Sequence, residues 1–180
     1  MLPFISCNFK LNMSELFEDL VNYSWERHGH NMPTCKLPHK FDSNLRNIFK
    51  LPNDAYIMLH NLVPVHTLRP NEIPYLTRWH IDDHRKSAIF IPVSLDNVNH
   101  YTEFKYNNSI HKAPYSRGIP LLFNVKELHK VSNNDISLPR NVISIGLPTT
   151  SYTDLVSAYQ TNLLVDKDNF ADNIFNITHL

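Results

Sequence analysis

Apolar residues recur at helical spacing in only two parts of this chain. Over residues 14–28 the apolar positions repeat at helical spacing behind Ser14, which we interpret as the N-cap, so one amphipathic helix is predicted there. The following stretch, 33–74, is dense in proline, which excludes a long helix and predicts loops joining short strands such as 55–59. The second helix is expected over 152–159, and the Asn- and Asp-rich end from Asp166 is expected to be loosely attached.

Between these two helices the pattern is that of strands. Short runs rich in Ile, Val, Leu, Phe and Tyr, separated by turn-forming residues, predict strands over 75–80, 88–95, 101–106, 119–123, 129–132 and 141–147. Several short strands at such spacing are typical of a sandwich or a barrel. The expected fold class is mainly β with flanking helices. One domain is expected over 1–180, with a barrel core at about 55–147, an N-terminal helix at about 14–28 and a C-terminal extension over 148–180.

Length and charge narrow the possible functions. A chain of 180 residues and 21.0 kDa is long enough for one well-buried core. Its 17 basic and 17 acidic residues cancel, so neither nucleic acid nor an anionic membrane is an expected partner. No apolar run approaches the roughly 20 residues that a membrane helix needs, and no secretion signal is recognisable at the start. Cys7 and Cys35 lack a metal-site or redox spacing, so reduced thiols in a cytoplasmic protein are expected.

Four polar residues of the second half carry the candidate chemistry: His80, Asp82, His129 and Arg140. In an extended strand, residues two apart share a face, so His80 and Asp82 can reach one metal while Ile81 turns into apolar packing. Two imidazoles and one carboxylate are the ligand set that holds iron(II) on one face and leaves the opposite positions open. A His-x-Asp pair arises easily by chance, so the interpretation depends on the downstream residues.

Arginine is the residue expected to bind an anion beside such a metal. His129 and Arg140 are predicted to lie on neighbouring strands across a hairpin, and a guanidinium is a planar fork that fits a carboxylate with two hydrogen bonds. Arg85 follows the His-Asp pair closely enough to contact a carboxylate at the barrel mouth, with a solvated side chain as the alternative. His84 is a weaker candidate ligand, because its polar surroundings favour a turn.

In order and spacing, these residues resemble the 2-oxoglutarate- and iron(II)-dependent oxygenases, most closely the prolyl- and aspartyl/asparaginyl-hydroxylase-like members. The family motif is His-x-Asp/Glu, a distal His and then an Arg, and the resemblance covers about 75–147. The chain departs from the motif just before Arg140, where Leu138-Pro139 replaces a glycine that is common in the family.

The resemblance implies a double-stranded β-helix, that is, a jelly-roll or cupin-like barrel. It further implies that His80, Asp82 and His129 hold Fe(II) and that Arg140, with Arg85 as a second candidate, binds the co-substrate 2-oxoglutarate. With O2, and with ascorbate as a helpful reductant, the expected reaction is hydroxylation of a peptide or small-molecule substrate with release of succinate and CO2. The oligomeric state is left open.

Two alternatives lie outside this family of enzymes. The first is a non-catalytic, cupin-like metal- or ligand-binding β-barrel in which His80, Asp82 and His84 bind and Arg140 is structural. It needs His84 and not His129, whereas the oxygenase needs His129 and not His84. The second is an inactive jelly roll of the capsid- or tail-associated kind, which would need no metal. It is disfavoured, because no structural requirement explains these polar residues at these spacings.

Overall fold

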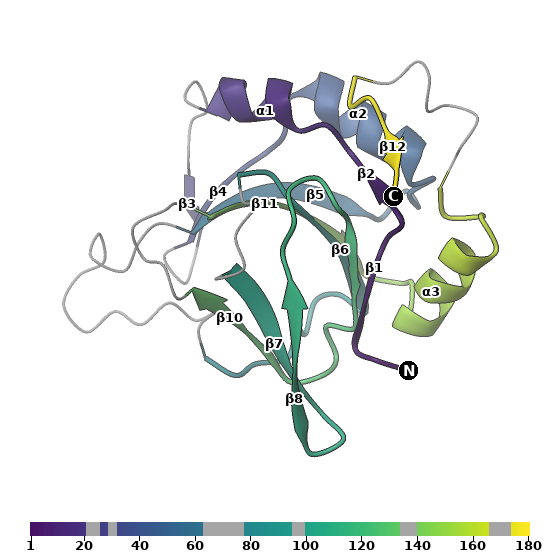
Figure 1. Ribbon diagram of the computed structural model, residues 1–180. Coiled ribbons are helices and arrows are strands. Elements are labelled where there is room, and N and C mark those ends of the chain that lie inside the picture. The colour runs from purple at the N-terminus through teal and green to yellow at the C-terminus, as the bar shows by residue number, and fades with distance from the viewer. Residues whose placement is uncertain (21–25, 29–31, 63–77, 95–99, 134–139, 166–173) are drawn as a thin grey trace.

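Figure 1 shows a computed structural model of the protein, in which strands dominate, as predicted. It describes residues 1–20, 26–28, 32–62, 78–94, 100–133, 140–165 and 174–180. The larger sheet is antiparallel and has the order β1-β9-β6-β11-β5-β4-β3. Along that order the strands are Phe4–Ser6, Leu121–Phe123, Ser87–Pro92, Arg140–Leu147, Tyr56–Leu62, Met32–Cys35 and Glu26–His28.

A second sheet faces the larger one and has the order β10-β7-β8 (Figure 1). Its strands are His129–Asn133, His100–Tyr106 and Ser109–Pro114. Apolar side chains fill the space between the two sheets: Ala88, Leu121 and Phe123 from the larger sheet, Phe104 and Ala113 from the smaller one, and Tyr115 and Val125 from the connections. We call these residues the inner cluster; one of them, Phe104, contacts His129.

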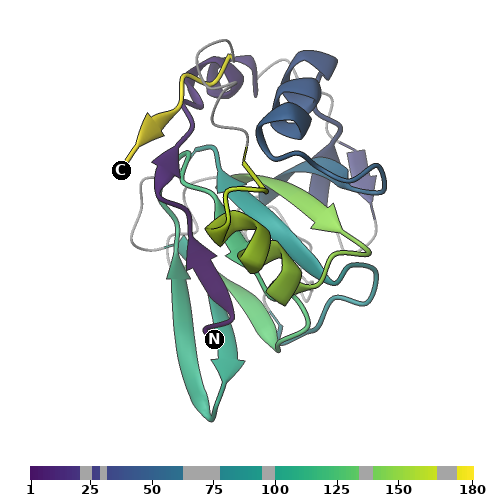
Figure 2. The same cartoon turned by 90° about the vertical axis from the view of Figure 1, so that its right-hand side faces the viewer.

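The opposite face of the larger sheet is covered by helices. These are α1 (Ser14–Asp19), α2 (His39–Ile48) and α3 (Tyr152–Gln160), and Figure 2 shows α3 lying across the sheet. The main core joins β11 residues such as Ile143 and Ile145 to helix residues such as Leu16, Phe41 and Leu155. None of the helices in the described ranges is long and apolar enough to cross a membrane.

The predicted helix over 14–28 is too long. Helix α1 ends at Asp19, and Glu26–His28 form β3, which pairs with β4. Ser14 is not the N-cap either: Met13 occupies that position, and the backbone N–H of Ser14 donates to Asn12 Oδ1 at 3.0 Å. Pairing with a neighbouring strand has overridden the local helical period, because backbone hydrogen bonds of a sheet edge outweigh weak intrinsic propensities.

Helix α2 was missed because the proline-rich stretch was predicted to contain only loops and strands. The prolines bound this helix instead of interrupting it, with Pro38 at its N-cap position and Pro52 beyond its end. Phe41, Leu45 and Ile48 of α2 are buried at helical spacing.

The chain end from Asp166 was predicted to be loosely attached, and for 174–180 this is wrong. Phe175 is 1% exposed, and its ring lies 5.8 Å from that of Phe41 in α2. The last strand, β12 (Thr178–His179), pairs with β2 (Phe9–Lys10). This segment is therefore docked through a buried aromatic side chain and a short two-stranded sheet.

The hairpin predicted to join His129 to Arg140 is also wrong. Strand β10, which begins at His129, pairs with β7 in the smaller sheet, whereas β11, which begins at Arg140, lies between β5 and β6 in the larger one. Consecutive strands thus cross from one sheet to the other, as they do when two sheets wrap around a shared interior.

Gly118 is expected to be essential for joining the N-terminal segment to the larger sheet. Its φ is 75°, and a Cβ added there would lie 2.0 Å from the carbonyl oxygen of Leu11. We expect Gly118→Ala to lower the free energy of unfolding in urea by about 2–4 kcal/mol. Asn108→Gly is the control, because Asn108 has a φ of 59° in the β7–β8 turn and glycine adopts that conformation readily. Equal stability of the two variants would contradict the explanation.

Candidate metal centre

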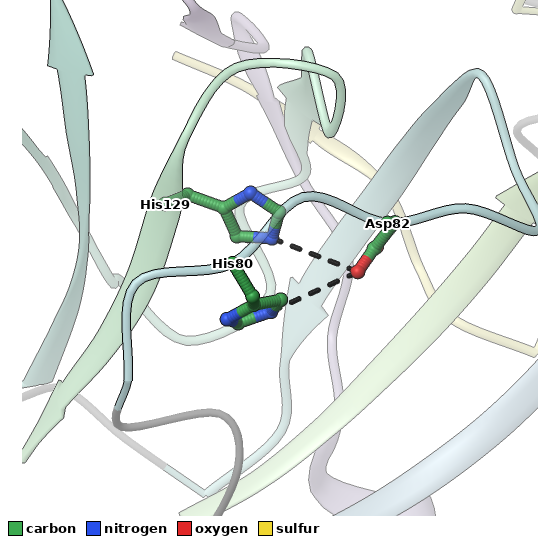
Figure 3. A group of neighbouring side chains, drawn as sticks. All are labelled: His80, Asp82 and His129. Atoms are coloured by element: carbon green, nitrogen blue, oxygen red, sulfur yellow. Dashed lines mark ion pairs between the residues drawn. The ribbon is translucent and has the colours of Figure 1, made fainter.

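Two histidines, His80 and His129, meet in an isolated antiparallel bridge beside Phe104 of the inner cluster. The N–H of His80 donates to the carbonyl of His129 and the N–H of His129 donates to the carbonyl of His80, both at 2.9 Å. The predicted strand 75–80 is reduced to this bridge in its described part, since 75–77 lie outside the described residues. The bridge brings the two rings side by side, with centroids 4.4 Å apart (Figure 3).

Each imidazole is oriented by a backbone carbonyl two residues earlier in the chain. His80 Nδ1 lies 2.8 Å from the carbonyl oxygen of Arg78, and His129 Nδ1 lies 2.8 Å from that of Glu127. A carbonyl only accepts hydrogen bonds, so Nδ1 of each ring carries a proton, and in the neutral form of the ring the lone pair lies on Nε2. This is the usual way in which a protein fixes a metal-binding histidine.

Asp82 completes a compact group with the two histidines. Its Oδ1 lies 3.7 Å from His80 Nε2 and 3.9 Å from His129 Nε2, the two contacts drawn in Figure 3. One ligand atom from each of the three residues lies within 4.8 Å of the others, and all three residues are buried. The donor set and its spacing fit a divalent transition metal, whose bonds to such ligands are about 2.0–2.2 Å long.

Asp82 does not belong to a regular strand, and Ile81 does not turn into apolar packing as predicted: it is 43% exposed. Irregular backbone positions Asp82 instead. Its N–H donates to the carbonyl of Val125 at 3.1 Å, and the ammonium of Lys126 donates to its carbonyl at 2.6 Å. The turn that precedes His129 therefore also holds the segment that carries Asp82.

Burial and charge set the protonation states of the site. Burial lowers the pKa of His129 to about 4, so this imidazole is neutral near pH 7. Burial alone would raise the pKa of Asp82, but the charge and the hydrogen bond of Arg85, together with the neighbouring His129 and His80, outweigh burial and hold that pKa below its ordinary value. The carboxylate is thus ionised and the His129 ring is neutral, which are the forms that bind a metal.

Arg85 is buried, so the alternative of a solvated side chain is wrong. It is 9% exposed, its Nε lies 2.6 Å from Asp82 Oδ2, and its Nη1 donates to Ser144 Oγ at 2.7 Å. His84 is exposed and does not belong to the His-Asp-His group; its ring lies 6.0 Å from that of Tyr56.

Arg140 is the one predicted site residue whose side chain falls outside the described part of the chain. Its backbone opens β11 and is paired with Leu62 of β5. Its role as an anion clamp stays a prediction.

Two polar residues of the larger sheet were not singled out from the sequence. The hydroxyl oxygen of Thr34 on β4 is buried and has no hydrogen-bond partner among the described residues.

The second residue, Tyr56 on β5, is paired with Gly146 of β11. A Cβ at position 146 would lie 2.1 Å from Tyr56 Cζ, so only glycine leaves room for the tyrosine ring there. Burial raises the pKa of the Tyr56 hydroxyl, on which the nearby charges of Arg85 and Asp82 also act. The glycine inside a strand run was the available signal.

Comparisons with known proteins find similarity in structure alone. No family model matches the sequence, and no curated protein matches it. A prolyl-4-hydroxylase from Pseudomonas putida superposes with a TM-score of 0.55 at 10% identity, covering 83% of this chain and 94% of that one. HygX from Streptomyces hygroscopicus, solved with nickel, 2-oxoglutarate and hygromycin B, gives 0.49 at 8% identity, covering 83% and 85%.

The likeness to the prolyl-4-hydroxylase establishes the fold of this protein as a jelly roll, the double-stranded β-helix that the resemblance implied. The likeness is one of fold, and it joins this chain to a prolyl-4-hydroxylase, one of the kinds of protein that the sequence resembles.

The lowered pKa of His129 predicts how the metal-free protein responds to acid. An unfolded histidine has a pKa of about 6.5, so between pH 6.5 and 4 the unfolded chain takes up a proton at residue 129 that the folded chain does not. Acidification over this window should therefore lower the free energy of unfolding, with a contribution from His129 of up to about 3 kcal/mol. Urea titrations with a chelator at both ends of the window measure it.

The matched variants are His129→Gln and His39→Gln, because His39 is exposed. The first should lose this part of the pH dependence, whereas the second should keep it. Asp82 does not confuse the result, since its lowered pKa places its own contribution at still lower pH. The same dependence in wild type and His129→Gln would show that His129 is not held neutral by burial.

Proposed function

We propose that the protein is an iron(II)- and 2-oxoglutarate-dependent oxygenase that hydroxylates a protein side chain or a small molecule. One observation carries the proposal: two imidazoles and one carboxylate lie buried within metal-binding distance of one another inside a jelly roll. Two histidines with one carboxylate are the typical ligand set of non-haem iron(II) oxygenases. Bound iron(II) and 2-oxoglutarate would supply the oxidising chemistry, with O2 as oxidant and succinate and CO2 as products.

The chain's own residues provide geometry and exclusion of water. His80 Nε2, Asp82 Oδ1 and His129 Nε2 would hold the metal from one side. The ring of Phe104 stacks on His129 with centroids 5.5 Å apart, and through it the site adjoins the inner apolar cluster. A low-dielectric floor of this kind limits the water that can reach the ligands and strengthens the electrostatic interactions there.

The inner side of the larger sheet offers groups suited to the anionic co-substrate. The buried Thr34 hydroxyl and the Tyr56 hydroxyl are donors there. For the carboxylate clamp we propose Arg140, as the resemblance of the sequence implies, because a guanidinium fits a carboxylate with two hydrogen bonds. Arg85 is the second arginine of the site, but its Nε and Nη1 already bind within the protein.

A peptide or a small molecule is the proposed substrate class. The shared fold of a prolyl-4-hydroxylase supports testing peptides first. The decisive assay measures succinate release with iron(II), ascorbate and 2-oxoglutarate against a panel of peptides and free amino acids. Absence of 2-oxoglutarate turnover by metal-loaded protein across that panel would favour the alternative, the non-catalytic, cupin-like barrel.

A cytoplasmic location stays a prediction, in keeping with the two buried, unbridged thiols of Cys7 and Cys35.

The metal content of two histidine variants distinguishes the oxygenase from the non-catalytic, cupin-like barrel. We expect His129→Ala to lose iron(II), because it removes one of three protein ligands, whereas His84→Ala should keep wild-type metal content and 2-oxoglutarate turnover. Metal content after anaerobic loading and desalting is the measurement. Loss of metal from His84→Ala with retention in His129→Ala would overturn the assignment.

Arg140 should affect the co-substrate and not the metal. Replacing Arg140 with Leu removes a charge-assisted pair that contributes about 2–5 kcal/mol when desolvated, so 2-oxoglutarate affinity should fall by roughly tens- to thousands-fold. Iron affinity should barely change. Calorimetry with 2-oxoglutarate tests this, with Arg78→Leu as the control because Arg78 is exposed beside the same motif. Unchanged 2-oxoglutarate binding in Arg140→Leu would rule out this clamp.

A further inference from the structure

The two oxygens of the Asp82 carboxylate have different surroundings. Oδ1 faces the histidines, 3.7 Å from His80 Nε2 and 3.9 Å from His129 Nε2. Oδ2 faces the other way and accepts a hydrogen bond from Arg85 Nε at 2.6 Å. A carboxylate can bind a metal through one oxygen or through both. Here one of the two is already engaged by a cation.

Arg85 is itself held from a second direction by the larger sheet. Its Nη1 donates to Ser144 Oγ at 2.7 Å, and Ser144 lies fully buried in the middle of β11. Its guanidinium carbon lies 5.3 Å from the centre of the Phe90 ring on the neighbouring strand β6. A guanidinium is rigid and planar, so anchoring two of its nitrogens and one of its faces fixes the direction in which Nε points.

We propose that Arg85 is a positioning residue of the metal centre: braced by Ser144 and Phe90, it holds Asp82 Oδ2 so that the carboxylate offers only Oδ1 to the metal. This inference rests on the proposed function. Its consequence is that Asp82 would supply one ligand oxygen to a bound metal instead of two. Arg85 then acts through Asp82 and is not itself the 2-oxoglutarate clamp.

Arg85 can favour metal binding only by orienting the Asp82 carboxylate, because its own charge does not attract the metal. A guanidinium beside the ligand repels an incoming cation, so its charge works against the metal. Replacing Arg85 with a neutral residue would therefore mix two opposite effects, lost orientation and lost repulsion. Arg85→Lys keeps the charge and removes the planar fork, because one ammonium nitrogen cannot reproduce the two fixed N–H directions. It isolates the positioning effect.

The test uses cobalt(II) as the probe, without 2-oxoglutarate, because its visible absorption reports its coordination. In Arg85→Lys we expect cobalt affinity to fall by about tenfold or more and the absorption spectrum to change. Ser144→Ala should give a smaller change in the same direction, and the double variant should fall no further than Arg85→Lys, since both substitutions break one chain of contacts. The matched control is Arg46→Lys, which alters a similar pair at a distant place, where Arg46 Nε lies 2.8 Å from Asp42 Oδ1.

Wild-type affinity and spectrum in Arg85→Lys would overturn the proposal, including the case in which that variant loses only 2-oxoglutarate binding. If Arg85→Lys fails to fold, as judged by circular dichroism, Ser144→Ala decides: an unchanged affinity and spectrum there would overturn it equally. Failure of the proposed function looks different. Wild-type protein would then bind no cobalt, or would bind it and never turn over 2-oxoglutarate, whereas the positioning role is decided by the variants relative to wild type.

Discussion

The site depends on one pair of backbone hydrogen bonds, those that join His80 to His129. The two residues exchange both N–H···O=C bonds, so they lie directly opposite each other. Their side chains are therefore neighbours, and the centroids of their rings are 4.4 Å apart. The carbonyls of Arg78 and Glu127 then orient the rings in matching ways. Two histidines distant in sequence are therefore placed with little freedom by backbone geometry alone.

Electrostatic balance is the second requirement of such a buried site. A lone carboxylate at this depth would be costly, and Arg85 compensates the charge of Asp82. The same burial disfavours the charged form of His129, so the imidazole stays a neutral donor. In the absence of metal the protein thus contains one buried ion pair next to a neutral ring, a combination that it can hold without a cation in place.

The sequence predicted most of the strands and the His-Asp-His group, because both depend on local signals. Alternation and turn residues located β7, β10 and β11 to within a few positions, and the residue types at 80, 82 and 129 predicted a group of side chains that the structure brings together. Sheet membership was not predictable in this way, because strand partners are chosen by tertiary packing. The same reason explains the overlong first helix and the missed role of Ser144, whose partner Arg85 is remote in sequence.

The order of the strands has a consequence for how the protein folds. Strand β1 pairs with β9, so Phe4 finds its partner Phe123 only after all the strands between them in sequence, β2 to β8, have been made. Such non-local pairings raise the contact order and slow folding, since long loops must close before any interaction rewards them. During synthesis, β1 therefore stays unpaired until β9 has been made. His80, Asp82 and His129 also come from distant segments, so they can assemble only late in that process.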